Sequence, residues 1–179
     1  MKKLILVLLA AMTFNANAAL ITLTTDKAEY NVGDTINVTV NALDLLPNGV
    51  KTFFYGFNSS IAINSSLISY DVNSIQDLGA LGDMPELNLS NNAFDFVSLN
   101  AIQNINAMFI PFFNGAEAAQ TGLDAISLFS FQLMALDVGT VELSLFEAQL
   151  SNAFGFPLVG VGNEGVSFTI AEVLKHLVR

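Results

Sequence analysis

Residues 124–170 alternate apolar and polar side chains in three short stretches, and this pattern limits the possible fold more than any other feature. An apolar residue at every second position places one face of a strand in a core and the other in water. Turn residues follow the first two stretches, at residues 137–140 (DVGT) and around Gly155. The apolar positions are Ile126, Leu128, Phe129, Phe131, Leu133 and Ala135, then Val141, Leu143, Leu145, Ala148 and Leu150, then Val166, Phe168 and Ile170. The pattern predicts consecutive strands, and it contains no group that could start a reaction.

The first half of the chain repeats this pattern. Ile36, Val38, Val40 and Ala42 alternate with polar residues, and shorter strand patterns cover residues 67–72 and 93–99. Many short strands joined by regular turns are typical of sandwiches. We therefore predict an all-β fold, a two-sheet antiparallel β-sandwich of jelly-roll type. It would cover residues 19–170 as one domain.

Two segments break the strand pattern. Residues 73–92 contain Gly79, Gly82 and Pro85, which predict a long loop-like connection. Residues 171–179 carry the one helical pattern, with apolar residues on one side and basic residues late. Nine residues are too few to be helical alone, so we expect this C-terminal tail to dock or fray.

Residues 1–18 have the three parts of a secretory signal peptide. Two lysines begin the segment, an apolar run follows over residues 4–12, and Ala-Asn-Ala ends it at Ala18. The run is much shorter than the about 20 apolar residues that a membrane span needs. We expect cleavage after Ala18, export to an extracellular or periplasmic location, and no membrane span in the mature chain.

The charge and the cysteine count exclude several classes of function. Without residues 1–18, four basic residues remain against sixteen acidic ones, a net charge of −12 with histidine neutral. Such a chain repels phosphate backbones, so nucleic acid is not an expected partner. The chain has no cysteine, which excludes disulfides and thiolate metal sites.

Possible catalytic motifs have simpler explanations. Residues 160–165 spell GVGNEG, but a dinucleotide site needs this pattern between a strand and a helix, whereas a strand pattern follows here. His176 is the single histidine, and neither GxSxG nor HExxH occurs. Carboxylate pairs at Asp83 and Glu86, or at Glu142 and Glu147, have the groups that a glycosidase needs. We interpret these carboxylates as solvated surface charges and the chain as non-enzymatic, with no catalytic, cofactor-binding or metal-binding residues.

Calcium is the one metal that the composition permits, because oxygen donors are abundant. They occur at residues 71–73, at Asp77 and Asp83, and over residues 88–95. None of these segments has the spacing of an EF-hand loop. We therefore expect no cofactor, with a structural calcium ion left as an alternative.

Three segments resemble cohesin-like domains, which are β-sandwich modules of bacterial cell-surface and cellulose-degrading assemblies. VGDTINVTV at residues 32–40 is similar to the family's opening strand, and FYGFNSSIAINSSLISYDV at residues 54–72 resembles its aromatic strand and turn. LFSFQLMALDVGTVELSL at residues 128–145, followed by AQLSNAFGFPL at residues 148–158, is similar to its penultimate strands and glycine-containing loop. The resemblance implies a secreted, non-catalytic binding module, for which dockerin domains are the partners in cellulosomes.

The chain departs from this family pattern in three places. Asn64-Ser65 occupies a turn that often has Asp-Pro, and Phe154 and Phe156 flank Gly155 where polar residues are usual. No Pro-Glu-Pro sorting tail follows residue 170. The contact surface for dockerin cannot be transferred from any motif.

Aromatic residues beyond those needed for one core face suggest where a partner binds. Residues 53–57 (FFYGF) place rings on both faces of one expected strand, and residues 107–113 (AMFIPFF) contain a proline that favours an edge or a bulge. We predict a surface for another secreted or surface protein, or for extracellular matrix. A carbohydrate-binding module that holds a polysaccharide is the alternative, although the absence of Trp disfavours it. The residues of the expected surface are Phe53, Tyr55, Phe57, Phe109, Phe112 and Phe113.

Overall fold

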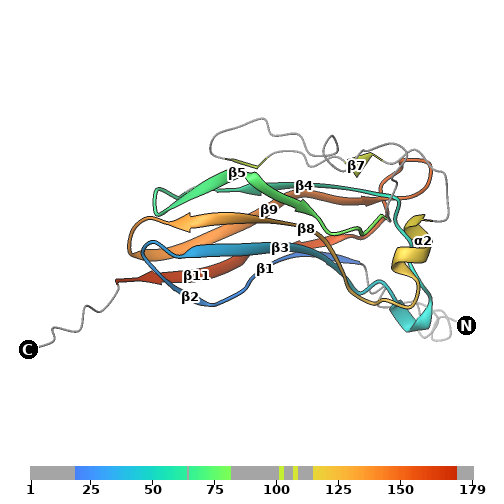
Figure 1. The fold of residues 1–179 in the computed structure, drawn as a ribbon. Coiled ribbons are helices and arrows are strands. Elements are labelled where there is room, and N and C mark those ends of the chain that lie inside the picture. Colours follow the sequence, from blue (N-terminus) through green and yellow to red (C-terminus); the bar gives the residue numbers. More distant parts are fainter. Residues whose placement is uncertain (1–18, 64, 82–100, 103–106, 109–114, 173–179) are drawn as a thin grey trace, which may run out of the picture.

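Two β-sheets lie face to face in this protein (Figure 1). The structure is a computed structural model and describes residues 19–63, 65–81, 101–102, 107–108 and 115–172. The expected two-sheet sandwich is therefore confirmed. The expected signal peptide, the expected strand over residues 93–99 and the tail from residue 173 lie outside the described residues.

The first sheet has the strand order β10-β1-β3-β8-β5. All neighbours in it are antiparallel except β1 and β10, which run parallel over three residue pairs. Its strands are β1 (Leu20–Thr25), β3 (Thr35–Leu43), β5 (Ile68–Asp77), β8 (Ile126–Ala135) and β10 (Gly162–Glu164).

The second sheet has the order β2-β11-β9-β4-β6, and β7 also pairs with β4. Here the short edge strand β2 runs parallel to β11, and the other neighbours are antiparallel. The prediction of an antiparallel sandwich thus holds for the long strands and fails at two short edge pairs. The strands are β2 (Glu29–Asn31), β4 (Gly56–Ala62), β6 (Ala101–Ile102), β7 (Ala107–Met108), β9 (Gly139–Ser151) and β11 (Val166–Ala171).

The alternating residues form the core, as the sequence pattern predicts. Ile36, Val38, Val40 and Ala42 of β3 are fully buried between the sheets. Each of the three larger side chains, Ile36, Val38 and Val40, contributes about 1.5–3 kcal/mol by leaving water. The ring of Phe57 in β4 stacks on Phe129 in β8 at 5.9 Å between centroids, so aromatic contacts join the two sheets.

The strand β5 is longer than the sequence pattern indicates. The expected loop begins only after Asp77, because the strand continues through an irregularity between Asp71 and Gln76. At this irregularity the Asn73 amide donates to Asp71 Oδ1 (2.9 Å), and the Ser74 hydroxyl donates to the Asp71 carbonyl (2.6 Å). These local hydrogen bonds replace the missing ladder bonds and let the strand resume.

Short helical segments lie at one end of the sandwich, on the right in Figure 1. They are the 3-10 helix η1 (Pro47–Gly49) and the helix α2 (Gly115–Gln120). Helix α2 was not predicted, because six residues are too few to show a helical period. Among the described residues, no helix has the length and apolar character needed to cross a membrane.

Candidate functional site

The glycine-rich motif at residues 160–165 is part of the scaffold. Its centre forms β10, which pairs with β1, and β11 follows in place of the helix that a dinucleotide site requires. A Cβ atom on Gly165 would lie 2.2 Å from the carbonyl oxygen of Leu143. Glycine is therefore needed here because β9 passes close to the backbone.

A shallow hollow of about 400 Å³ lies on the outer side of β4 and β9. Its lining residues are Ala62, Ser65, Thr140, Glu142 and Ser144. A glycosidase needs two carboxyl groups across its cleft, and among the described residues of this lining Glu142 is the one carboxylate. Asp83 and Glu86, the other candidate pair, lie outside the described residues.

The oxygen donors considered for calcium are only partly described. The side chain and the carbonyl of Asp71 accept the hydrogen bonds that stabilise the irregular part of β5. Within the residues that the structure describes, no three acidic, histidine or cysteine side chains gather into a possible metal site. Residues 83 and 88–95 of the calcium hypothesis lie outside that part.

The structure describes three of the six residues of the expected partner surface, Phe53, Tyr55 and Phe57. Phe57 is 4% exposed and stacks on Phe129, so its assignment to a contact surface is wrong. Phe53 and Tyr55 are half-buried and precede β4, which starts only at Gly56. The expectation that one strand carries rings on both faces is corrected accordingly. Phe109, Phe112 and Phe113 lie outside the described residues.

Polar contacts fix the two half-buried rings in place. The hydroxyl of Tyr55 donates to Glu117 Oε1 of α2, and this hydrogen bond, together with burial, raises the pKa of Tyr55. The Lys51 ammonium lies 5.7 Å from the centre of the Phe53 ring and donates to the Leu123 carbonyl (2.7 Å). Both rings thus have defined positions at the end of the sandwich that carries α2.

A buried glutamine ties this end together. Gln120 is fully buried at the last position of α2. Its side chain accepts from the Phe54 amide (3.1 Å) and donates to the carbonyls of Phe54 (2.7 Å) and Ala80 (3.1 Å). Three segments that are distant in sequence are therefore joined by one side chain.

The turn after β9 lies beside these residues and is held by one asparagine. Asn152 Oδ1 accepts from the amides of Phe154 (2.9 Å) and Phe156 (3.1 Å). The backbone amide of Asn152 donates to the Phe156 carbonyl (2.9 Å), and the Gly155 amide donates to the Asn152 carbonyl (2.9 Å). Gly155 has φ +78°, which favours glycine. These hydrogen bonds are all within the chain, so the turn has a defined conformation without a partner.

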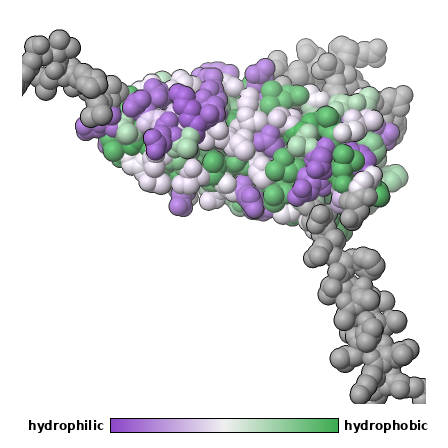
Figure 2. All heavy atoms as spheres, turned by 90° about the horizontal axis from the view of Figure 1, so that it is seen from below, coloured by the Kyte–Doolittle hydropathy of each residue, from purple (hydrophilic) through white to green (hydrophobic). Residues whose placement is uncertain are grey.

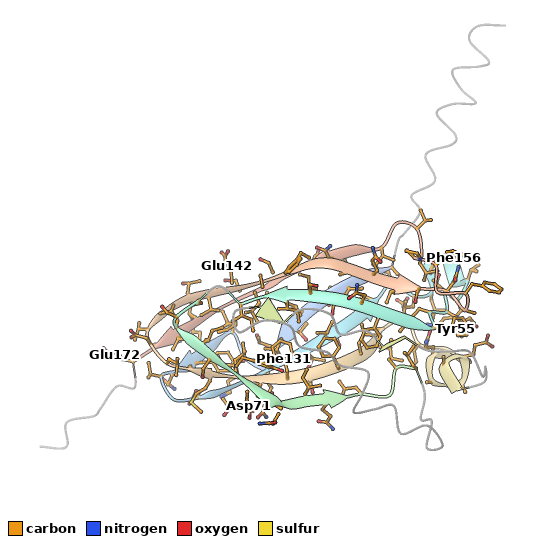
Figure 3. All side chains as sticks on the ribbon, turned by 90° about the horizontal axis from the view of Figure 1, so that it is seen from above. Tyr55, Asp71, Phe131, Glu142, Phe156 and Glu172 are labelled. Atoms are coloured by element: carbon orange, nitrogen blue, oxygen red, sulfur yellow. The ribbon has the colours of Figure 1, made fainter. Side chains whose placement is uncertain are left out.

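This fixed turn holds large apolar side chains in solvent. Phe154 is 84% exposed, Phe156 is 66% exposed and Val159 is fully exposed. The Tyr55 amide donates to the Ser151 carbonyl (2.8 Å), so the turn and the half-buried rings are neighbours. Figure 3 shows Tyr55 and Phe156 at the same end of the molecule. We name this region the aromatic end and define it as Phe53, Tyr55, Phe154, Phe156 and Val159.

The surface around the aromatic end differs from the opposite end. In Figure 2, apolar residues gather toward the right of the visible face, and hydrophilic residues form a patch toward the left. Exposed Asp44, Glu117 and Asp124 lie on the segments that surround the aromatic end. Burial lowers the pKa of Lys51, and the Asp124 carboxylate opposes this shift. The aromatic end is therefore an apolar surface with an acidic border.

The fold defines the class of the protein: the chain has a cohesin-like fold. One similar solved structure is the seventh ScaB type I cohesin of Pseudobacteroides cellulosolvens. It has a TM-score of 0.59 and 11% identity, over 89% of this chain and 97% of that chain. A non-cellulosomal cohesin of the hyperthermophilic archaeon Archaeoglobus fulgidus has a TM-score of 0.58 and 15% identity, over 87% and 92%.

A third similar structure belongs to a type I cohesin–dockerin complex of Clostridium thermocellum. It has a TM-score of 0.55 and 12% identity, over 87% of this chain and 94% of that chain. No family model and no curated protein matches the sequence. The resemblance to cohesins noted in the sequence is thus confirmed at the level of fold.

The aromatic end was only partly visible in the sequence. Phe53 and Tyr55 were expected to be surface residues, and the structure leaves both half-exposed. Phe154 and Phe156 were seen only as departures from the cohesin pattern at a turn. Two rings on either side of a turn glycine have no strand face to occupy, and this was the signal that could have identified them.

Proposed function

We propose that this chain is an exported, non-catalytic binding module whose partner is another protein at the cell surface or in the extracellular matrix. The observation that carries the proposal is the fixed turn that exposes Phe154 and Phe156. Burying such a ring against a partner is worth about 1.5–3 kcal/mol. Because the turn is already ordered, little conformational entropy is lost on binding.

The fold supports a protein partner. One of the similar structures is a cohesin in complex with a dockerin. The leader pattern of residues 1–18 supports export. The described lining of the hollow contains one carboxylate, that of Glu142, whereas glycoside hydrolysis needs two, and this favours a binding function.

The proposal is tested by identifying and reconstituting the partner. The full chain, tethered through its C-terminus, is exposed to the proteins exported by its source organism, and retained proteins are identified. We expect one of them, once purified, to bind the chain saturably in isothermal titration calorimetry. Saturable binding only to glycans on an array would instead establish a carbohydrate-binding module. Release of reducing sugar from a polysaccharide would establish an enzyme.

A further inference from the structure

The charges of the described residues are strongly one-sided. They include thirteen acidic residues and two lysines, Lys27 and Lys51. Lys27 lies at the opposite end of the sandwich, where its ammonium is 3.9 Å from Asp34. Lys51 is already engaged by the Leu123 carbonyl and the Phe53 ring. Among the described residues, the aromatic end therefore presents apolar rings, its border presents exposed carboxylates, and the lysine beside it, Lys51, is already engaged.

From this combination we infer that the aromatic end binds a cationic protein segment in which lysine or arginine side chains flank one or two large apolar side chains. The apolar side chains lie against Phe154 and Phe156, and the cations face Asp44, Glu117 and Asp124. The inference rests on the proposed function and names the surface and the chemistry of the partner. Charge complementarity of this kind accelerates association and excludes acidic competitors.

Three other occupants fit the surface less well. Anionic lipid headgroups would be repelled by the acidic border. A sugar ring prefers Tyr or Trp, whose rings carry a polar edge, whereas the most exposed rings here are phenylalanines. A second copy in a twofold contact would bring the same carboxylates together.

The test uses the full chain and three synthetic twelve-residue peptides with identical leucine and phenylalanine positions. The flanking residues are lysine in one peptide, serine in the second and glutamate in the third. Fluorescence anisotropy is expected to give saturable binding of the lysine peptide. The serine peptide should bind about tenfold more weakly, and the glutamate peptide should not bind. Absence of saturable binding by the lysine peptide overturns the inference.

The apolar part is tested by the double variant Phe154→Ser with Phe156→Ser. Both side chains are exposed, and the Asn152 hydrogen bonds to the backbone are retained, so folding should be unaffected. Affinity for the lysine peptide should fall at least about tenfold, as expected for central anchors. The matched control is Val32→Ser with Val138→Ser, two exposed apolar residues at the opposite end, which should change nothing. Equal affinity of the phenylalanine variant and the native chain contradicts the inference.

The acidic border is tested by charge removal with little change of shape. Asp44→Asn, Glu117→Gln and Asp124→Asn together keep the hydrogen-bond acceptors and should weaken lysine-peptide binding about tenfold. The control removes three carboxylates from the opposite end by substitution of Glu29, Asp137 and Glu172 with their amides. An equal loss in this control would show attraction by net charge alone and would overturn the assigned surface.

The remaining occupants and the proposed function are separated by three further measurements. Co-sedimentation with anionic or zwitterionic vesicles that is lost in the double phenylalanine variant would assign the surface to lipid. Concentration-dependent dimerisation that is lost in the same variant would assign it to a second copy. If a partner identified as described above binds the double variant as tightly as the native chain, the proposed function stands and the surface is wrong.

Discussion

At the scale of single residues, Gly165 has a role that the dinucleotide-like spelling of its motif does not suggest. In Gly165→Ala the new Cβ would lie 2.2 Å from the Leu143 carbonyl oxygen and 3.2 Å from Ser144 Cα. Since backbone atoms cannot move aside cheaply, we expect a loss of about 3 kcal/mol in the free energy of unfolding, measured by circular dichroism in urea. The control is Gly162→Ala, whose Cβ would meet only the end of the Leu20 side chain at 3.1 Å. Similar losses in both variants would contradict the packing explanation.

Asp26 makes stability depend on pH. Burial raises the pKa of Asp26, but hydrogen bonds from the Tyr30 hydroxyl (2.6 Å) and from Asn37 outweigh burial and hold this pKa below its ordinary value. Asp26 therefore stabilises the fold above the unfolded-state pKa of about 3.9. This contribution is lost as the pH falls through the lower folded-state value.

The variant Asp26→Asn tests this dependence. At pH 7 it should be less stable than the native chain, and the difference should narrow as the pH falls from about 4 towards 2. Unfolding in urea, followed by circular dichroism across this range, measures the difference. Glu142→Gln, at an exposed position on β9, serves as the control. A difference that stayed constant with pH would exclude a titrating Asp26.

At the scale of elements, the long strands follow from the sequence and the features around them do not. The alternation of Ile36, Val38 and Val40 predicts burial directly, because every second side chain of a strand points to the same face of the sheet. Burial of Phe57 could not be foreseen, since its partner Phe129 lies 72 positions away. The hydrogen bonds of the Gln120 side chain could not be foreseen either, since their acceptors, the carbonyls of Phe54 and Ala80, are also distant in sequence. The local sequence pattern thus predicts the strands. The aromatic end could not be predicted in this way, because it forms where loops that are distant in sequence come together.

The conformation of the turn after β9 should depend more on the side chain of Asn152 than on the exposed rings of Phe154 and Phe156. In Asn152→Ala the amides of Phe154 and Phe156 lose their acceptor, which should cost about 1 kcal/mol in stability. Amide exchange should quicken in this turn and remain unchanged in β3. Lysine-peptide affinity should fall although both rings are retained, because binding must then order the turn.

The control for the turn is Asn163→Ala, at an exposed asparagine in β10. It should leave amide exchange in the turn and peptide affinity at native values. Unchanged exchange at residues 154 and 156 in Asn152→Ala would show that the turn does not need this side chain.

At the scale of the whole molecule, net charge should make salt act in opposite directions on stability and on binding. The described part has thirteen acidic residues and only two lysines, so its excess carboxylates repel one another. The screening length falls from about 30 Å in 0.01 M salt to about 8 Å in 0.15 M salt. We expect sodium chloride over this range to raise the unfolding temperature by about 2–4 °C, or about 1 kcal/mol. The same salt should weaken binding of the lysine peptide, because it screens the attraction at the aromatic end. In the control that substitutes Glu29, Asp137 and Glu172, the stability effect should shrink while the binding effect persists. If stability and affinity changed in the same direction with salt, the acidic border would not be the source of the attraction.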